Sequence, residues 1–240
     1  MQQPTLHSVQ AFRALAALLI VLLHVEGYLG NLGVELPIVL FRSFAFVGVD
    51  MFFIISGLVI TYISYTHISD RAYANRFIYK RLVRIFSNYW SIVLLTGGFV
   101  ALGLCQFSDD LRFWQSLFLV PQQPQYHMIA IVWTLSFELM FYGIFAVLLY
   151  ANKKIFFASL GCWALLSLIA LGTIKATPQS SVWVVYLLSP FHLEFLMGCA
   201  SGLAIKNNLY VRPLYCLCAG VMLVIATIIG TQEAPLWGEE

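Results

Sequence analysis

Two residues in one apolar stretch near the start of the chain have side chains suited to chemistry. Arg13 and His24 are eleven positions apart, which on an α-helix corresponds to three turns plus about 20° and a rise of roughly 16 Å. We therefore expect both side chains on one helix face. An imidazole can take a proton from a hydroxyl group near neutral pH, and a guanidinium binds phosphates or polarises a carbonyl. The alternative is that Arg13 anchors the helix at an interface and His24 is a packing residue.

Asp50 is a carboxyl group inside a second apolar stretch, where charged side chains are unfavourable and often mark a functional path. Gly57, seven residues later, lies on the same helix face and permits close approach of another helix. The sequence leaves two roles open for Asp50. One is catalytic, and the other is a structural ion pair, for example with Arg42.

Two further carboxyl groups lie in later apolar stretches. Glu138 shares a helix face with Tyr142, four residues on, and this polar stripe predicts a polar neighbour or water inside the membrane. We predict a catalytic role for Glu138, with Tyr142 in the same site. Glu194 shares its face with Gly198, and it is interpreted either as a binding residue or as a lone buried carboxylic acid.

A row of cations precedes the third apolar stretch. Arg76, Lys80 and Arg84 follow one another at steps of four residues, with Arg81 beside them, so the first three share a helical face. Such a row could grip phosphate groups. It is equally explained as a topological signal combined with attraction to anionic lipid.

These residues must be positioned by membrane helices, because 61% of the 240 residues are hydrophobic, 10% are charged and the mean hydropathy is +0.86. Soluble domains are roughly one-quarter charged. Apolar runs of about 20 residues are long enough to cross a bilayer. We predict an all-α polytopic bundle forming one transmembrane domain over residues 1–240, with seven spans at about 11–30, 44–65, 85–105, 128–150, 155–174, 182–205 and 213–231.

The distribution of basic residues predicts the orientation of the bundle, since cytoplasmic loops are enriched in Lys and Arg. A cytoplasmic N-terminus places most of them inside and few outside. The inside group is Arg13, Arg71, Arg76, Lys80, Arg81, Arg84, Lys153, Lys154, Lys206 and Arg212, and the outside group is Arg42, Arg112 and Lys175. The long outside connection at 106–127 is aromatic and apolar in part, and we expect it along the membrane surface.

Composition also excludes several classes of function. A net charge of +2 gives no basis for nucleic-acid binding. The five cysteines have no Cys-x-x-Cys spacing, and no histidine cluster is present, so neither a metal site nor a disulfide framework is expected. The apolar run after Arg13 is not a signal peptide, because no Ala-x-Ala-like cleavage site follows it and further spans do.

Four motifs, in order, resemble the acyltransferase-3 family of integral-membrane acyltransferases. The first stretch, SVQAFRALAALLIVLLHV, carries an Arg-x10-His signature through Arg13 and His24, and FVGVDMFFIISGLVI is similar to the family's Gly-Val-Asp, Phe-Phe and Ser-Gly run. KRLVRIFSNYW resembles an Arg-rich segment of the family, with Ser87 where proline is usual. WTLSFELMFY resembles its Trp-Ser-Leu-x-x-Glu-x-x-Phe-Tyr segment, with Thr134 in place of serine.

The resemblance implies transfer of an acyl group, often acetyl, from cytoplasmic acyl-coenzyme A to a hydroxyl of an extracytoplasmic or lipid-linked saccharide. Acyl-coenzyme A would be the donor substrate, and no resident cofactor is expected. The expected location is a bacterial inner membrane, with the lipid bilayer as partner. Family members usually continue through further C-terminal spans, so this chain is expected to lack C-terminal helices.

On this hypothesis, His24 activates the acceptor hydroxyl or carries the acyl group transiently, and Asp50 or Glu138 orients the imidazole. Arg13 binds the coenzyme's phosphates or polarises the thioester, with the cations at 76–84 as auxiliaries and Glu194 in substrate binding. The same charged residues would also fit two other functions. One is a transporter or exporter with a proton or anion pathway, and the other is an inactive truncated scaffold.

Overall fold

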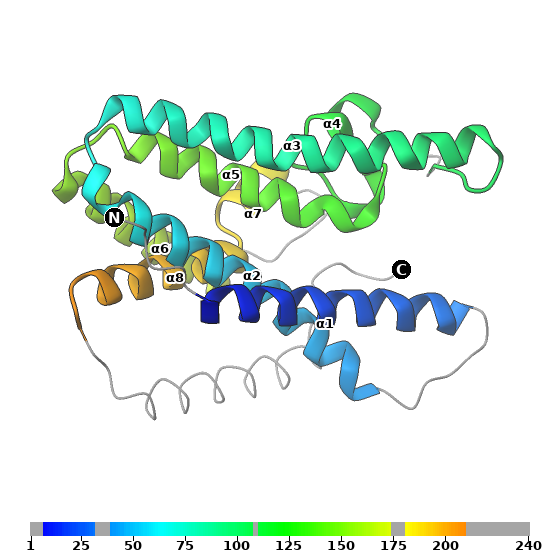
Figure 1. The fold of residues 1–240 in the computed structure, drawn as a ribbon, viewed down its shortest axis with the longest axis horizontal. Helices are drawn as coiled ribbons and strands as arrows, with labels where there is room; N and C mark the ends of the chain where they lie inside the picture. The colour runs from blue at the N-terminus through cyan, green and yellow to red at the C-terminus, as the bar shows by residue number, and fades with distance from the viewer. Residues whose placement is uncertain (1–6, 32–38, 108–109, 174–180, 210–240) are drawn as a thin grey trace. The chain divides into compact units, whose positions relative to one another are not determined.

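The computed structural model describes residues 7–31, 39–107, 110–173 and 181–209. These residues form helices and contain no strand (Figure 1), which confirms the all-α prediction. In a bilayer only such segments satisfy their own backbone hydrogen bonds. The helices are α1 (His7–Asn31), α2 (Val39–Ser64), α3 (Arg71–Ala101), α4 (Phe113–Leu117), α5 (Trp133–Leu148), α6 (Lys153–Thr173), α7 (Val182–Leu187) and α8 (Pro190–Lys206), with 3-10 turns at Tyr65–His67, Pro124–Tyr126 and Ala130–Val132.

Several of these helices have the length and apolarity of membrane spans. Within the described ranges, the segments long and apolar enough to cross a bilayer are Val47–His67, Lys153–Leu171 and Val182–Lys206, and shorter apolar helices cover Val9–Leu22 and Trp133–Leu148. The chain is therefore a membrane helical protein. The predicted seventh span, 213–231, lies outside the described residues.

The span predicted at 182–205 is confirmed as Val182–Lys206, but it contains a break between α7 and α8, because Pro190 lacks a backbone N–H and its ring would clash with an earlier carbonyl. Ser189 begins the new helix by accepting the Phe191 N–H on its hydroxyl, 3.3 Å away. Two predicted span boundaries are wrong: the span predicted at 128–150 begins only at Trp133, and the helix predicted to start at 85 begins at Arg71 and already includes the cationic row.

The chain divides into two compact units, and each is described by itself. Unit 1 comprises residues 1–63 and 194–240, and unit 2 comprises residues 64–193. In unit 1, α1 packs on α2 through Gly48, whose missing side chain makes room for α1. A Cβ at Gly48 would lie 2.9 Å from the carbonyl oxygen of Ala16, and Ala16 is fully buried.

A second glycine contact in unit 1 joins α2 to α8. A Cβ on Gly57 would lie 2.0 Å from the Phe195 carbonyl oxygen, and one on Gly198 would lie 2.0 Å from that of Ile54. Small residues at such positions allow the close helix approach that membrane interfaces use. The contacts between the two helices advance in the same direction along both. From one end to the other, the contacting pairs are Asp50 with Glu194, Ile54 with Gly198, Leu58 with Gly202 and Tyr62 with Lys206. The two helices thus run parallel, as predicted spans two and six must.

Unit 2 is built on α3 and α5, which lie side by side (Figure 1). Phe77 of α3 packs its ring 5.5 Å from that of Phe145 and 6.2 Å from that of Tyr142. The turn before α3 is tied to the turn before α6, since the Ser69 N–H donates to the Leu149 carbonyl at 2.9 Å. Both turns were predicted on the cytoplasmic side, and the structure places them at the same end of the unit.

Candidate functional site

The first candidate group is the pair on α1. Since α1 is one continuous helix from His7 to Asn31, Arg13 and His24 share a face within about 20° and are separated by roughly 16 Å along the axis. Arg13 is half-buried and His24 is exposed. The His24 ring nitrogen Nδ1 lies 2.7 Å from the carbonyl oxygen of Ile20. This bond makes Nδ1 the protonated nitrogen, because a carbonyl only accepts, and leaves Nε2 with its lone pair.

The second group is the carboxyl pair of unit 1. A hydrogen bond joins the side chains of Asp50 and Glu194, so Glu194 is not a lone carboxylic acid. Two carboxylates have only acceptor atoms, and one member of the pair therefore carries a proton. Asp50 lies about 200° around α2 from Gly48, the residue that faces α1. The structure thus brings Asp50 to Glu194, and among the described residues neither nitrogen of His24 is hydrogen-bonded to a carboxyl group. The side chain of Arg42 lies outside the described residues.

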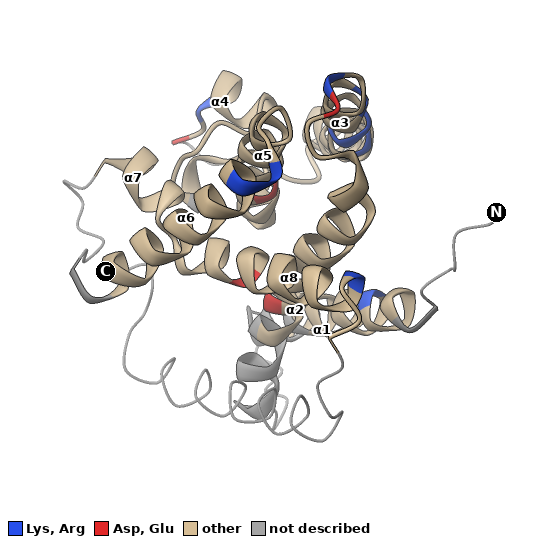
Figure 2. Ribbon diagram, turned by 90° about the vertical axis from the view of Figure 1, so that its left-hand side faces the viewer, with Lys and Arg blue, Asp and Glu red and all other residues tan. Residues whose placement is uncertain are grey.

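The cationic row occupies the first half of α3. Arg76, Lys80 and Arg84 are exposed, and their spacing on one uninterrupted helix places them on a single face, as predicted. Figure 2 shows the Lys and Arg residues of α3 in blue. Arg81 lies on a different face and is half-buried. The row therefore separates into three solvent-facing cations and one that is turned toward the interior of unit 2.

Arg81, Tyr142 and Glu138 form a polar cluster between α3 and α5. The Arg81 guanidinium lies over the ring of Tyr142 at 5.1 Å and over that of Phe77 at 5.3 Å, a cation–π arrangement. The Tyr142 hydroxyl donates a hydrogen bond to Glu138 Oε1. Tyr142 is buried, with 2% of its surface exposed. The structure thus brings Arg81 to the Glu138 and Tyr142 face that the sequence predicted on one helix, and the Tyr142 hydroxyl fixes the orientation of the Glu138 carboxyl.

We expect Tyr142→Phe to disturb this cluster locally. The ring beneath Arg81 remains, but the half-buried Glu138 loses its hydrogen-bond donor, which costs about 1–1.5 kcal/mol, the upper part of the range for an intramolecular hydrogen bond. The measurement is the unfolding free energy in detergent. Tyr150→Phe is the matched control, because the exposed Tyr150 hydroxyl donates to Asn75 and its loss should cost less than about 1 kcal/mol. Equal losses in the two variants would contradict a special role for the bond between Tyr142 and Glu138.

A further polar cluster, which the sequence analysis did not predict, lies in the connection between α3 and α5. Ser116, Gln122 and His127 are buried there. The Gln122 amide nitrogen lies 3.1 Å from Ser116 Oγ and 3.2 Å from His127 Nδ1. The signal was the concentration of Gln and His after an aromatic segment, but periodicity carries no information about contacts within an irregular connection.

His127 differs from His24 in its surroundings. Only 3% of its surface is exposed, and burial lowers the pKa of the imidazole from 6.5 to about 4, because desolvation disfavours the charged form. His127 lies outside the membrane-spanning segments and is neutral at physiological pH. A second buried histidine, His192, is surrounded by rings, with that of Trp163 at 4.8 Å and that of Phe137 at 5.7 Å. His192 has the environment of a packing residue.

Comparison with known proteins identifies the family. Residues 6–237 match the acyltransferase 3 family, which is described as an acyltransferase domain. The exopolysaccharide production protein ExoZ of Rhizobium meliloti (strain 1021) is 32% identical over 174 residues, which cover 65% of this chain and 49% of that protein. The chain therefore spans about half the length of this relative. No solved structure matches. The match over nearly the whole chain shows that this protein belongs to the acyltransferase 3 family of membrane acyltransferases.

Proposed function

We propose that this protein transfers an acyl group, most simply acetyl, from cytoplasmic acyl-coenzyme A to a hydroxyl of an extracytoplasmic or lipid-linked saccharide. Family membership implies acyltransferase activity. The similarity to a protein of exopolysaccharide production supports a saccharide acceptor. The observation that carries the proposal is the single helix α1, which holds a cation and an imidazole on one face about 16 Å apart.

His24 is the proposed base. Its Nδ1–H is held by the Ile20 carbonyl, so the Nε2 lone pair is available to take the acceptor's hydroxyl proton. The hydroxyl oxygen then attacks the thioester carbon, the carbon–sulfur bond breaks, and the proton passes to the departing thiolate. A variant of this route has Nε2 carry the acyl group first. In both, the Ile20 carbonyl contributes to orienting the imidazole, which is also the role proposed for Asp50 or Glu138.

Arg13 is the proposed donor-binding residue, with Arg76, Lys80 and Arg84 as auxiliary cations. On the predicted topology all four are at or near the cytoplasmic interface, where acyl-coenzyme A is found. A guanidinium binds phosphate oxygens in a bidentate manner. Asp50 and Glu138 remain proposed catalytic carboxyls, Asp50 as half of a pair that shares one proton with Glu194, and Glu138 in its bond with Tyr142.

Removing the cation of α1 should weaken donor binding selectively. We expect Arg13→Ala to raise the KM for acetyl-coenzyme A about tenfold or more, with little change in kcat, because a contact made equally in the ground and transition states changes KM alone. The measurement is initial rate against donor concentration in membrane vesicles. Arg112→Ala is the control, since Arg112 stacks on Tyr126 in the predicted extracytoplasmic connection. An unchanged KM for Arg13→Ala would leave that residue as an interfacial anchor.

The proposed function is tested by following labelled acetyl groups from acetyl-coenzyme A into the saccharide fraction of membranes that contain the full chain. Label that becomes ester-linked to saccharide supports the proposal. Uptake or export of substrate without a labelled ester would favour a transporter. A well-folded protein that neither binds nor consumes acetyl-coenzyme A would favour a scaffold.

A further inference from the structure

We propose that Glu194 is the protonated member of the carboxyl pair in unit 1 and that it holds Asp50 in the ionised form, as a positioning residue for acyl transfer. The place of the proton follows from the surroundings of the two carboxyl groups and does not depend on any reaction. That the ionised Asp50 then serves acyl transfer rests on the proposed function. Glu194 would thus act through Asp50 and not on a substrate directly.

The packing of α2 on α8 fixes the two carboxyl groups opposite each other. Backbone contacts backbone at Ile54 and Gly198, since a Cβ on the glycine would lie 2.0 Å from the Ile54 carbonyl oxygen. Asp50 lies one helical turn before Ile54, and Glu194 lies one turn before Gly198. Because the two helices run parallel, the carboxyl groups meet one turn beyond this contact. They cannot separate unless the whole interface opens.

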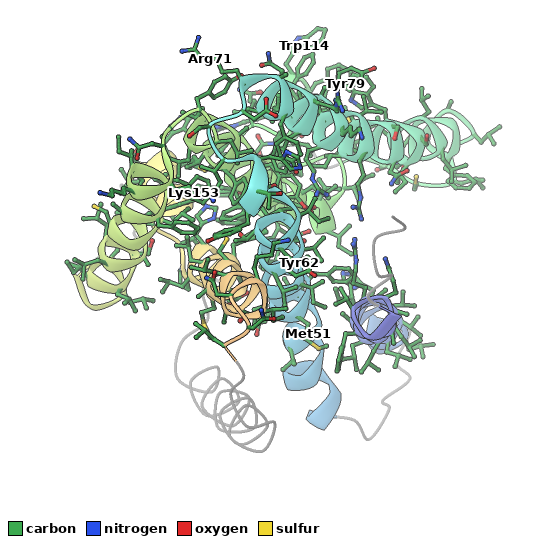
Figure 3. The ribbon with its side chains drawn as sticks, turned by 60° about the vertical axis from the view of Figure 1, so that its left-hand side comes forward. Met51, Tyr62, Arg71, Tyr79, Trp114 and Lys153 are labelled. Carbon is green, nitrogen blue, oxygen red and sulfur yellow. The ribbon has the colours of Figure 1, made fainter. Side chains whose placement is uncertain are left out.

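Apolar side chains pack beside the carboxyl pair. The rings of Phe53 and Phe195 are 4.6 Å apart, and only 4% and 0% of these two residues are exposed. Phe53 follows Asp50 by three residues, and Phe195 is the neighbour of Glu194. Met51, the residue after Asp50, is labelled in Figure 3 and marks the place of the pair on α2. Two negative charges in contact beside such rings would be very costly, so the pair keeps one proton.

The two carboxyl groups differ in their access to solvent and to hydrogen-bond donors. Glu194 Oε2 is buried, and no N–H or hydroxyl group of the described residues donates to it. Neither oxygen of Asp50 is in that situation, because each one either is accessible or has a hydrogen-bond partner. A negative charge is costly where nothing solvates or pairs it. The proton therefore belongs on Glu194, and the charge belongs on Asp50.

The position of Asp50 along its helix suits a role on the acceptor side of the membrane. Asp50 is the fourth residue of the span Val47–His67, and the predicted topology puts this end of the span on the extracytoplasmic side, where the proposed acceptor arrives. A carboxylate accepts hydrogen bonds and can take a proton, whereas a carboxylic acid must first place its own proton. By carrying the proton of the pair, Glu194 keeps Asp50 in the form that its proposed catalytic role needs.

The proton can be located by infrared spectroscopy of the purified full chain in a detergent without ester groups. A protonated carboxyl group has a C=O stretching band apart from the bands of carboxylates, and ¹³C lowers its frequency. At about pH 7, where ordinary carboxyl groups are ionised, we expect the native protein to show such a band. It should shift with ¹³C in the glutamate carboxyl groups and stay in place with ¹³C in those of aspartate. This measurement needs no substitution and does not depend on the folding of a variant.

Two isosteric variants assign the band to one residue of the pair. Glu194→Gln should remove the acid band, and Asp50→Asn should keep it. Glu138→Gln is the matched control and should also keep it, because Glu138 accepts the Tyr142 hydroxyl proton. Loss of the band in Asp50→Asn with retention in Glu194→Gln would place the proton on Asp50 and overturn the inference. A native spectrum without the band, or a band that both variants of the pair lose or both keep, would overturn it as well.

The positioning role has its own measurement, the kinetics of acetyl transfer in membrane vesicles. Glu194→Gln keeps a neutral donor for Asp50, so we expect kcat within about threefold of native. Glu194→Leu removes the donor and Asp50→Asn removes the charge, so each should lower kcat about tenfold or more at an unchanged KM for acetyl-coenzyme A. Equal kcat values for the two Glu194 variants, or normal turnover by Asp50→Asn, would overturn the positioning role. A native protein that transfers no acetyl group would contradict the proposed function and leave the infrared assignment of the proton intact.

Discussion

His24→Ala is expected to lower kcat for acyl transfer by about 100-fold to 10,000-fold, the range typical for loss of a general acid–base group. The imidazole is the proposed acceptor of the hydroxyl proton, and the other histidine of α1, His7, is the first residue of the helix, far along the axis from His24. The side chain is exposed, so its removal leaves no cavity and the fold should persist. The measurement is single-turnover transfer of labelled acetyl groups at saturating donor.

His24→Asn separates the base from the helix contact. Its amide N–H can still reach the Ile20 carbonyl, as Nδ1 does now, but it offers no basic nitrogen near neutral pH. Both variants should therefore lose turnover to a similar extent. His67→Ala is the control, because it removes another exposed histidine, which stacks on Tyr73. Normal turnover in a His24 variant that inserts into membranes would show that the base lies elsewhere.

Gly198→Ala is expected to destabilise unit 1 by about 3 kcal/mol or more, at the upper end of the range for overpacking. The added methyl group would lie 2.0 Å from the Ile54 carbonyl oxygen, and that neighbour is helix backbone that cannot move aside alone. Separation of α8 from α2 would also break the contact between Asp50 and Glu194. The measurement is the unfolding free energy in detergent, with transfer activity measured in parallel.

Gly161→Ala is the matched control, and its effect should have the opposite sign. Gly161 lies within α6, and a Cβ there would meet nothing within 4 Å. Alanine is favoured over glycine in a helix interior by about 1 kcal/mol, so this variant should be neutral or more stable. Similar destabilisation by both substitutions would contradict the close packing of α2 on α8.

The sequence predicted the elements and several faces of this protein. Apolar runs in a bilayer must become helices, because unsatisfied backbone groups are too costly there, and α1, α2 and α6 follow the predicted spans closely. The side-chain period of a helix then placed Arg13 with His24 and Gly57 with Asp50. The break before α8 could also have been predicted from the sequence, because Pro190 is visible there. The prediction used apolarity alone and did not take the proline into account.

Only the tertiary structure decided which of these faces meet. Helical period fixes the direction of Asp50 around its own axis, but whether that direction leads to His24 or to Glu194 depends on which helix packs there, and the glycines of α2 and α8 bring Glu194. The pairing of Gln122 with His127 likewise depends on the path of an irregular connection. Local sequence determines backbone geometry over a few turns, whereas contacts between distant segments arise from packing that no single segment encodes.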